Sequence, residues 1–325
     1  MAWLVTGGAG YIGAHVVAAL QADGARVVVL DDLSTGFPER LPADVPLIEA
    51  NVADADAVAR TLTDHSIDGV VHLAAKKAVG ESVEQPLLYY RENVCGLVSL
   101  LDAVVAGGTR TSFVFSSSAS VYGTQAVEKV DEAALTCPES PYGQTKLAGE
   151  WLVAATAQAH GLHWAALRYF NVVGAAEPRL GDVGVHNLVP LVFKAMADGR
   201  RPQVFGGDYP TRDGSCIRDY VHVADIAEAH VAAVRAVGRG EDVGVVNIGR
   251  GEGVTVKEVL AQVATTVGHE VPYDVSGRRA GDPAQVVATV ERAAQVLGWR
   301  AGRDLPAMVD SAWKAWQARP GGAPE

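Results

Sequence analysis

The sequence is poor in cysteine and has no long apolar run, and each shortage excludes a class of protein. Its three cysteines, Cys95, Cys137 and Cys216, are scattered and odd in number, so neither a disulfide framework nor a cysteine zinc site is indicated. The nine histidines include no H-E-x-x-H pattern, and we expect no metal. No apolar stretch approaches the ~20 residues that cross a membrane. Residues 3–6 already read as a core strand and leave no room for a signal peptide, so we expect a cytoplasmic protein.

Basic residues are also scarce relative to acidic ones. The chain has 27 Lys and Arg against 38 Asp and Glu, for a formal net charge of −11. This charge argues against nucleic acid or an anionic membrane as a partner. An anionic substrate would have to be captured by particular arginines. The length of 325 residues, with 49% apolar and 20% charged residues, indicates a globular protein of one large or two smaller domains.

A glycine-rich turn follows the first strand. Gly7, Gly10 and Gly13 are spaced G-x-x-G-x-x-G, with Tyr11 and Ile12 between the last two. Glycines permit a tight turn and let the backbone approach a pyrophosphate, which then lies on the N-terminus of the next helix. We therefore predict that these five residues bind a dinucleotide.

The second strand, residues 26–30, favours NAD over NADP. Asp31 stands at its carboxyl end, where an acid can accept hydrogen bonds from the ribose hydroxyls. A ribose 2′-phosphate would be repelled there, and no arginine immediately follows Asp31 or Asp32 to bind one. Strand, glycines, helix, strand and acid in this order predict an NAD site.

Strands and helices go on alternating through the first half of the chain, and this indicates a parallel sheet covered on both faces. We predict an α/β fold: a doubly wound parallel-sheet (Rossmann) domain, 1–171, and a smaller C-terminal α/β domain, 172–325, for the substrate. A strand near 245–248 is expected to return to the first domain. The further strands are expected at 46–51, 69–73, 112–116 and 164–169, and the helices at 55–64, 86–105 and 140–160.

A tyrosine and a lysine are predicted to carry the chemistry. Ser140 can cap a helix that begins at Pro141, and this places Tyr142 and Lys146 four residues apart on one face. A tyrosine of pKa ~10 is a poor base at neutral pH. A lysine cation nearby should lower that pKa toward the range a general base needs. The alternative is a surface Tyr and Lys that merely share a face. Ser118, after the strand at 112–116, could bridge Tyr142 and a substrate hydroxyl.

With these motifs the sequence resembles the extended short-chain dehydrogenase/reductase family, and within it the UDP-glucose 4-epimerases. The resemblance covers nearly the whole chain. It is carried by the stretches 77–83, 116–118, 140–143, 168–174, 218–223 and 278–282. Departures are Asn51-Val52, where Asp-Ile usually stands near the adenine, and Ala75-Lys76, where Gly-Leu usually precedes Lys77.

The resemblance implies roles for particular residues. Ser118, Tyr142 and Lys146 would be catalytic. Tyr142 and Lys146 would also contact the cofactor, together with Lys77, Asn93 and Tyr169. The substrate would be held by Lys77, Ser118, Tyr142, Asn171, Asn187, Leu188, Arg218, Arg279, Asp282 and Val286. Arginine suits this work because its planar fork pairs with phosphate oxygens.

The implied reaction is the interconversion of UDP-glucose and UDP-galactose by transient oxidation at C4. Tyr142 would take the 4-hydroxyl proton while C4 gives hydride to NAD, and the keto sugar would turn over before hydride returns. Related 4,6-dehydratases carry Thr-Asp-Glu where this chain has Ser118-Ala119-Ser120, so elimination lacks its carboxyl groups. The open alternatives are another nucleotide-sugar epimerase of this family and a non-catalytic NAD-binding scaffold or sensor.

Two further expectations follow from the resemblance. A position four residues after Asp282 would lie beside the C2 substituent of the sugar, and a bulky tyrosine there would exclude an N-acetyl group. The residue is Val286, which predicts activity on UDP-GlcNAc and UDP-GalNAc as well; a register slip would place Gln285 or Val287 there instead. A homodimer is expected through the helices at 86–105 and 140–160.

Overall fold

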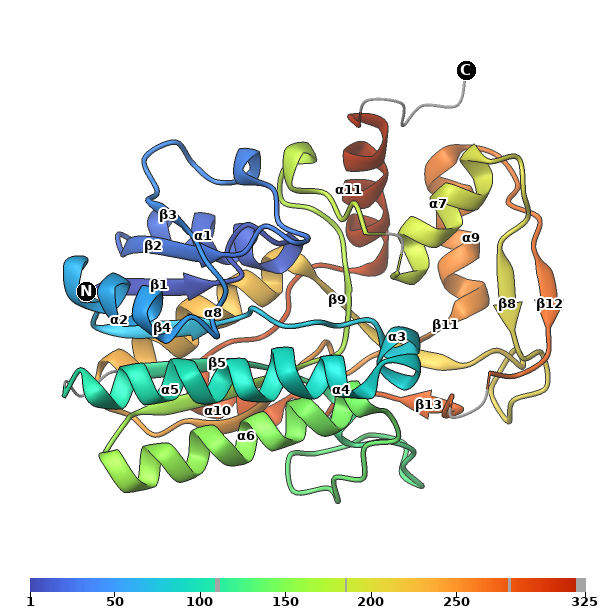
Figure 1. The fold of residues 1–325 in the computed structure, drawn as a ribbon. Coiled ribbons are helices and arrows are strands. Elements are labelled where there is room, and N and C mark those ends of the chain that lie inside the picture. The colour runs from blue at the N-terminus through green and yellow to red at the C-terminus, as the bar shows by residue number, and fades with distance from the viewer. Residues whose placement is uncertain (109–111, 185, 280–281, 320–325) are drawn as a thin grey trace.

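The computed structural model describes residues 1–108, 112–184, 186–279 and 282–319. In this part of the chain the largest element is a parallel sheet of seven strands (Figure 1). Their spatial order is β10 (Gly244–Ile248), β6 (Trp164–Tyr169), β5 (Ser112–Ser118), β4 (Gly69–His72), β1 (Ala2–Thr6), β2 (Arg26–Asp31) and β3 (Leu47–Glu49). β10 pairs with β6 in register Gly244 to Ala165, so the late strand lies at the edge of the sheet.

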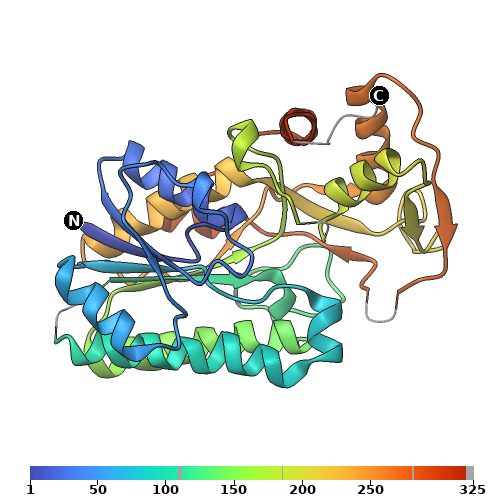
Figure 2. The ribbon, with the colours of Figure 1, turned by 45° about the horizontal axis from the view of Figure 1, so that its top comes forward.

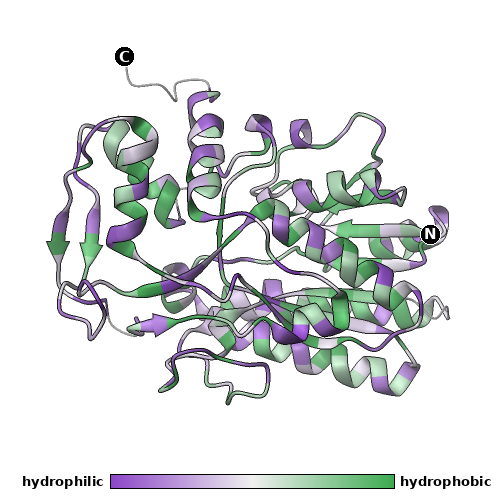
Figure 3. Cartoon of the chain, turned by 180° about the vertical axis from the view of Figure 1, so that it is seen from behind, coloured by the Kyte–Doolittle hydropathy of each residue, from purple (hydrophilic) through white to green (hydrophobic). Residues whose placement is uncertain are grey.

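Helices cover both faces of this sheet, as Figure 2 shows. One face packs against α1 (Tyr11–Ala22), α8 (Val223–Gly238) and α10 (Glu291–Leu297). The other packs against α2 (Ala55–Asp64), α5 (Gly96–Ala106) and α6 (Pro141–His160). The strands are runs of buried apolar residues such as Trp3–Val5 and Val27–Leu30, as expected for strands buried on both faces. In Figure 3 these strands are mostly green. The predicted doubly wound fold is confirmed.

The helix predicted over 86–105 is interrupted. It consists of α4 (Pro86–Tyr89), a π-helical segment η2 (Tyr90–Cys95) and α5. The π segment includes Asn93, whose buried side chain bonds to the backbone of Lys76. A π-bulge often marks a functional site, and here it brings the amide of Asn93 onto the loop after β4. The short helix α3 (Val79–Glu84) follows that loop.

The C-terminal half builds a smaller unit with its own core. Val189 and Phe193 of α7, Leu260 of α9, and Met308 and Trp316 of α11 pack together in it. Burying a side chain of this size stabilises the fold by ~1.5–3 kcal/mol. The helices are α7 (Leu188–Ala197), α9 (Val256–Val267) and α11 (Leu305–Gln317), and the strands are β7 (Asn171–Val173), β8 (Gln203–Phe205), β9 (Ile217–His222), β11 (Gly253–Thr255), β12 (Asp274–Ser276) and β13 (Gln285–Val286).

β9 organises the strands of this smaller unit. It pairs with β7, β11 and β13, while β8 pairs separately with β12. Three short 3-10 turns, η1 (Pro38–Arg40), η3 (Ala119–Val121) and η4 (Pro178–Leu180), complete the described elements. Among the described residues no helix is both long and apolar enough to cross a membrane. The division of the chain at residue 171 stays a prediction.

Candidate active site

The structure brings Ser118, Tyr142 and Lys146 together at the carboxyl edge of the large sheet. Ser140 caps α6 by accepting a hydrogen bond from the N–H of Gly143 at 3.2 Å, so the first turn of α6 begins where the sequence predicts. Lys146 is buried at 4% exposure, and its Nζ donates to the carbonyl oxygen of Ser116 at 2.9 Å. The same Nζ lies 6.0 Å from the centre of the Tyr142 ring.

The pKa of Tyr142 differs in direction from the prediction. Burial raises the pKa of Tyr142, and a hydrogen bond with the Ser118 hydroxyl opposes that rise. Burial also lowers the pKa of Lys146 to about 8, while the charge of Glu150 acts to raise it. Desolvation disfavours the charged form of both groups, and it sets the direction of both shifts. Each of the two groups therefore depends on its neighbours to be charged.

The glycine turn fits a dinucleotide in its backbone geometry. Gly7 has a left-handed φ of +72°, and a Cβ there would lie 2.6 Å from the backbone nitrogen of Ala74. A Cβ at Gly13 would lie 2.1 Å from the carbonyl oxygen of Gly7. Gly10 precedes α1, and no described side chain caps the first turn of that helix. The free N–H groups of this turn are an electropositive end that suits a pyrophosphate.

Asp31 is held at the end of β2 beside this turn. Its carboxylate accepts hydrogen bonds from the N–H groups of Ala9 and Leu33, both at 2.9 Å. Burial raises the pKa of Asp31, and these two backbone donors act to lower it. The next acid, Asp32, accepts from the amide of Asn51 at 3.0 Å. Asn51, where similar sequences usually have an aspartate, thus binds Asp32. An aspartate at position 51 would repel the Asp32 carboxylate.

Several predicted cofactor residues have their side chains engaged within the protein. Asn93 accepts from the N–H of Lys76 at 2.8 Å and donates to the Lys76 carbonyl and the Thr145 hydroxyl, both at 3.0 Å. It therefore holds the loop that carries Lys77, which is exposed. The hydroxyl of Tyr169 bonds with His230, so the ring of Tyr169 is fixed at the end of β6.

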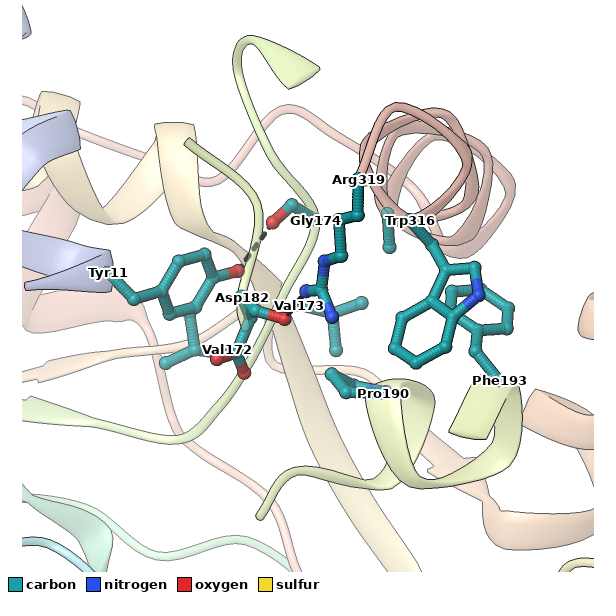
Figure 4. A pocket seen from close by; sticks show the side chains of 10 residues that line it. Tyr11, Val172, Val173, Gly174, Asp182, Pro190, Phe193, Trp316 and Arg319 are labelled. Carbon is teal, nitrogen blue, oxygen red and sulfur yellow. Dashed lines mark hydrogen bonds between the residues drawn. The ribbon is translucent and has the colours of Figure 1, made fainter. Parts of the chain in front are cut away.

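Tyr11 borders a small cavity (Figure 4). Ser118, Tyr142 and Lys146 are not among the residues that line it. The Tyr11 hydroxyl donates to the carbonyl oxygen of Gly174 at 2.5 Å. Because the side chain of Tyr11 is fixed this way, its backbone N–H remains the group available to a phosphate. The cavity is lined by Tyr11, Val172, Val173, Gly174, Asp182, Pro190, Phe193, Ala312, Trp316 and Arg319.

The predicted substrate residues of the C-terminal unit form a second group around β9. Arg218 donates to the carbonyl of Pro283 at 2.8 Å and lies 3.4 Å from Asp282. Val286 on β13 stands in register with Arg218. The guanidinium of Arg279 lies 3.7 Å from the centre of the Phe205 ring. Residues 280 and 281 of the predicted motif lie outside the described residues.

Two other predicted substrate residues begin α7, and a third begins β7. Asn187 precedes α7, and its amide donates to the Asp182 carboxylate at 2.7 Å. Leu188 is the first residue of the helix and packs at the edge of the C-terminal core. Asn171 is exposed at the start of β7. No described residues gather three metal-ligating side chains.

The sequence reasoning missed the polar groups that lie around Tyr142 and Lys146. Glu150 lies four residues beyond Lys146 and is bound by Arg168. His72 on β4 bonds with Thr6 at 2.7 Å, and burial lowers its pKa to about 3. The one feature of the sequence that could have indicated Glu150 is its spacing, which places it one turn beyond Lys146 on the same helix face. Nothing in the local sequence indicates Arg168, because it lies on a distant strand.

The fold and this site define an NAD-binding enzyme of the Rossmann type with a tyrosine and lysine pair. The NAD dependent epimerase/dehydratase family matches residues 3–249. The chain belongs to this family, and the membership predicted from the sequence is confirmed.

Similar proteins narrow the relationship. A UDP-glucose 4-epimerase of Halalkalibacterium halodurans is 41% identical over 99% of this chain and 97% of its own. The structure of a UDP-glucose-4-epimerase from Stenotrophomonas maltophila, with bound NAD and formylated UDP-arabinopyranose, is similar at TM-score 0.93. It has 40% identity and covers 98% of both chains. The Bifidobacterium longum UDP-glucose 4-epimerase, in complex with NAD+ and UDP, has TM-score 0.91 and 35% identity over 99% of this chain and 100% of that one.

Proposed function

We propose that this protein is an NAD-dependent UDP-glucose 4-epimerase, which interconverts UDP-glucose and UDP-galactose. The observation that carries the proposal is the placement of Tyr142, Ser118 and Lys146 beside the glycine turn and Asp31, on one edge of one sheet. The similar proteins described above support the same activity. A scaffold or sensor would not need a lysine buried at 4% exposure with its Nζ 6.0 Å from the ring of Tyr142.

The residues of the glycine turn fit NAD. The backbone N–H groups at the start of α1 would hold the pyrophosphate, and Asp31 would accept from the adenosine ribose. Lys146 would hold the nicotinamide ribose, near Tyr142. Bound NAD supplies a reversible hydride acceptor for C4 of the sugar. The carboxylate of Asp31, whose backbone donors come from Ala9 and Leu33, favours NAD over NADP.

The protein's own residues handle the proton. Tyr142 takes the proton of the sugar 4-hydroxyl and later returns it, and the Ser118 hydroxyl shares that hydrogen bond. Lys146 supplies the positive charge that makes the phenolate of Tyr142 accessible. Arg218, Arg279 and Asp282 would hold the UDP part, with Arg279 over Phe205. Because these residues would hold the UDP part and not the sugar, the sugar ring is free to rotate between its oxidation and its reduction.

The segment next to Ser118 argues against dehydration of the sugar. Ser118 donates to the hydroxyl of Ser120 at 3.1 Å, and Ala119 lies between them. Elimination across C5 and C6 requires an acid and a base of its own at this place, and this segment has no carboxyl group. The reaction is therefore confined to C4.

The test is to incubate the purified protein with UDP-galactose without any reductant and to follow UDP-glucose. We expect conversion, and denaturation of the protein should release NAD(H). A protein that releases NAD(H) but converts no UDP-sugar would favour the sensor alternative. Release of NADP(H) would contradict the role given to Asp31.

We also propose that the sugar pocket accepts N-acetylated UDP-hexoses. Val286 is half-buried and packs with the cluster of Val121, Leu147 and Phe170 near the catalytic groups. Gln285 donates instead to the carbonyl of Glu128 at 2.8 Å. The valine side chain at 286 is smaller than the tyrosine that would exclude an N-acetyl group.

Val286→Tyr should remove the N-acetyl activity selectively. We expect turnover of UDP-GlcNAc to fall by ~10–200-fold, since steric contacts of this size discriminate by that amount, while UDP-glucose changes little. Parallel assays on both sugars check it, with Gln285→Tyr as the matched control that should lack this selectivity. No UDP-GlcNAc turnover in the native protein would contradict the open pocket.

A homodimer is proposed through α4, α5 and α6. Leu87, Val98 and Trp151 on these helices are 76%, 39% and 65% exposed, and α5 and α6 lie side by side on one face of the sheet (Figures 1 and 2). Contiguous exposed apolar side chains are typical of interfaces. A cytoplasmic location likewise stays a prediction.

The measurement for the dimer is the mass in solution. We expect twice the chain mass of 34.0 kDa, and a monomer for Trp151→Glu. The matched control is Val275→Glu, which changes an apolar residue of 54% exposure on β12 and should remain dimeric. A native monomer at assay concentrations would refute the proposal.

A further inference from the structure

A buried carboxylate stands directly behind the catalytic lysine. Glu150 lies on α6 one turn beyond Lys146 and two turns beyond Tyr142, and it is 3% exposed. Its Oε1 accepts from Nε of Arg168 at 2.8 Å, and its Oε2 accepts from Nη2 at 2.6 Å. The hydroxyl of Ser117 also donates to Oε1. The carboxylate is thus fixed by three hydrogen bonds.

These partners come from the strands that carry the other catalytic groups. Ser117 lies on β5 between Ser116, whose carbonyl accepts from Lys146 at 2.9 Å, and Ser118. Arg168 stands opposite Ser117 in the pairing of β5 with β6. The Glu150 carboxylate therefore joins α6, β5 and β6 at the point where Lys146 is held.

Stability alone does not account for this pair. Arg168 is 4% exposed, and removing two charges from water costs about as much as their attraction returns. Apolar residues of similar volume often stabilise such a place equally well. A fixed negative charge one turn from a buried ammonium has a separate effect, because it favours the protonated lysine.

We propose that Glu150, held by Arg168 and Ser117, is a positioning residue of the catalytic step that acts through Lys146. It keeps the ammonium charged and against the Ser116 carbonyl, and the charged lysine in turn favours the phenolate of Tyr142. The proposal rests on the function proposed above and adds a residue to its machinery.

The other groups that face Lys146 do not replace this charge. On α6 these are Tyr142 and Glu150. On β4 His72 is neutral over the working range, since burial and the charge of Lys146 lower its pKa to about 3. On β6 the pKa of Tyr169 is raised by burial, so this phenol is also neutral. On β5 Lys146 meets the Ser116 carbonyl and the ring of Phe115, 5.3 Å away.

The test is Glu150→Gln, read by the pH titration of Tyr142. The phenolate is followed by its ultraviolet absorbance, as the difference between each protein and its Tyr142→Phe form. We expect phenolate formation to move to higher pH by about one unit or more, the usual effect of a lost neighbouring charge. At neutral pH the kcat should fall at least about tenfold, and its decline with rising pH should begin at a lower pH than in the native protein. Glu150→Asp, which keeps the charge, should restore much of both.

Two further variants separate this role from a structural one. Glu150→Gln combined with Arg168→Met removes both charges, so no unpaired arginine is left buried, and the titration should still move to higher pH. Asp225→Asn is the matched control, because Asp225 is a fully buried carboxylate that pairs with Arg303 outside the site. It should lower the melting temperature without moving the titration.

The outcomes are distinct. The proposal would be overturned if Glu150→Gln, alone and combined with Arg168→Met, lowered the melting temperature but left the Tyr142 titration unchanged. The Glu150–Arg168 pair would then have only a structural role. The titration of Tyr142 requires no sugar, so it tests the role of Glu150 whatever the substrate is. Failure of UDP-galactose conversion by the native protein would instead count against the function alone.

Discussion

Tyr142→Phe is expected to lower the rate of UDP-galactose epimerisation by at least ~10²–10⁴-fold, the usual contribution of a general acid–base group. The phenyl ring fills the same space in the first turn of α6, so the fold and the retained NAD should be unchanged. What is lost is the hydroxyl that exchanges a proton with the sugar and that bonds with Ser118. The measurement is kcat together with the amount of NAD(H) released on denaturation.

Tyr90→Phe is the control for this experiment. The hydroxyl of Tyr90 donates to Gln144 on α6 at 3.0 Å, so this variant also removes a tyrosine hydroxyl that contacts the helix. It should turn over at close to the native rate. Near-native turnover in Tyr142→Phe would remove this residue from the mechanism.

Lys146→Met should lower the rate by about 10- to 1000-fold at neutral pH, because an opposite charge nearby shifts a pKa by ~1–3 units. Without the ammonium the pKa of Tyr142 rises further above its usual value, so the phenolate forms only at higher pH. The rate of this variant should therefore keep rising with pH beyond the pH at which the rate of the native enzyme stops rising. Methionine fills the space of the lysine stem without a buried charge, so the fold should be retained.

The native enzyme should also lose activity at high pH. The pKa of Lys146 is lowered to about 8, so its charge is present below that pH and is lost above it. We expect kcat to decline as the pH rises past this region. Lys257→Met is the matched control, since Lys257 also donates to a carbonyl, that of Asp213, at 2.7 Å. A pH profile shared by Lys146→Met and the native protein would show that the lysine does not support the base.

The first half of the fold could be predicted because its signals are local. Runs such as 27–30 are apolar at every position, and a polar residue follows the run. The cap at Ser140 and the left-handed Gly161 that ends α6, at φ 71°, are both visible in the sequence. The proximity of Tyr142 and Lys146 could be predicted for the same reason, since helical spacing alone places them on one face.

The features that escaped prediction depend on distant contacts. The π segment 90–95 follows from the bonds of Asn93 to a loop 17 residues away, which no periodicity shows. Strands as short as β13, with two residues, have no alternation to detect. The Glu150–Arg168 pair needs the register of β5 with β6.

The direction of the Tyr142 pKa was missed for a related reason. The sequence shows that a lysine is near but not that Lys146 is buried and Tyr142 half-buried. Burial is a property of the packed site, and desolvation here raises the pKa of Tyr142. The catalytic roles of Tyr142 and Lys146 stay predictions.

The central claim is that C4 is oxidised and reduced again within one bound complex. The most direct measurement uses UDP-galactose with deuterium at C4, in ordinary water and without added reductant or NAD. We predict UDP-glucose that retains the deuterium at C4, because the hydrogen leaves and returns as hydride within the site. Product that has exchanged this hydrogen with water, or a failure to form UDP-glucose at all, would contradict the account.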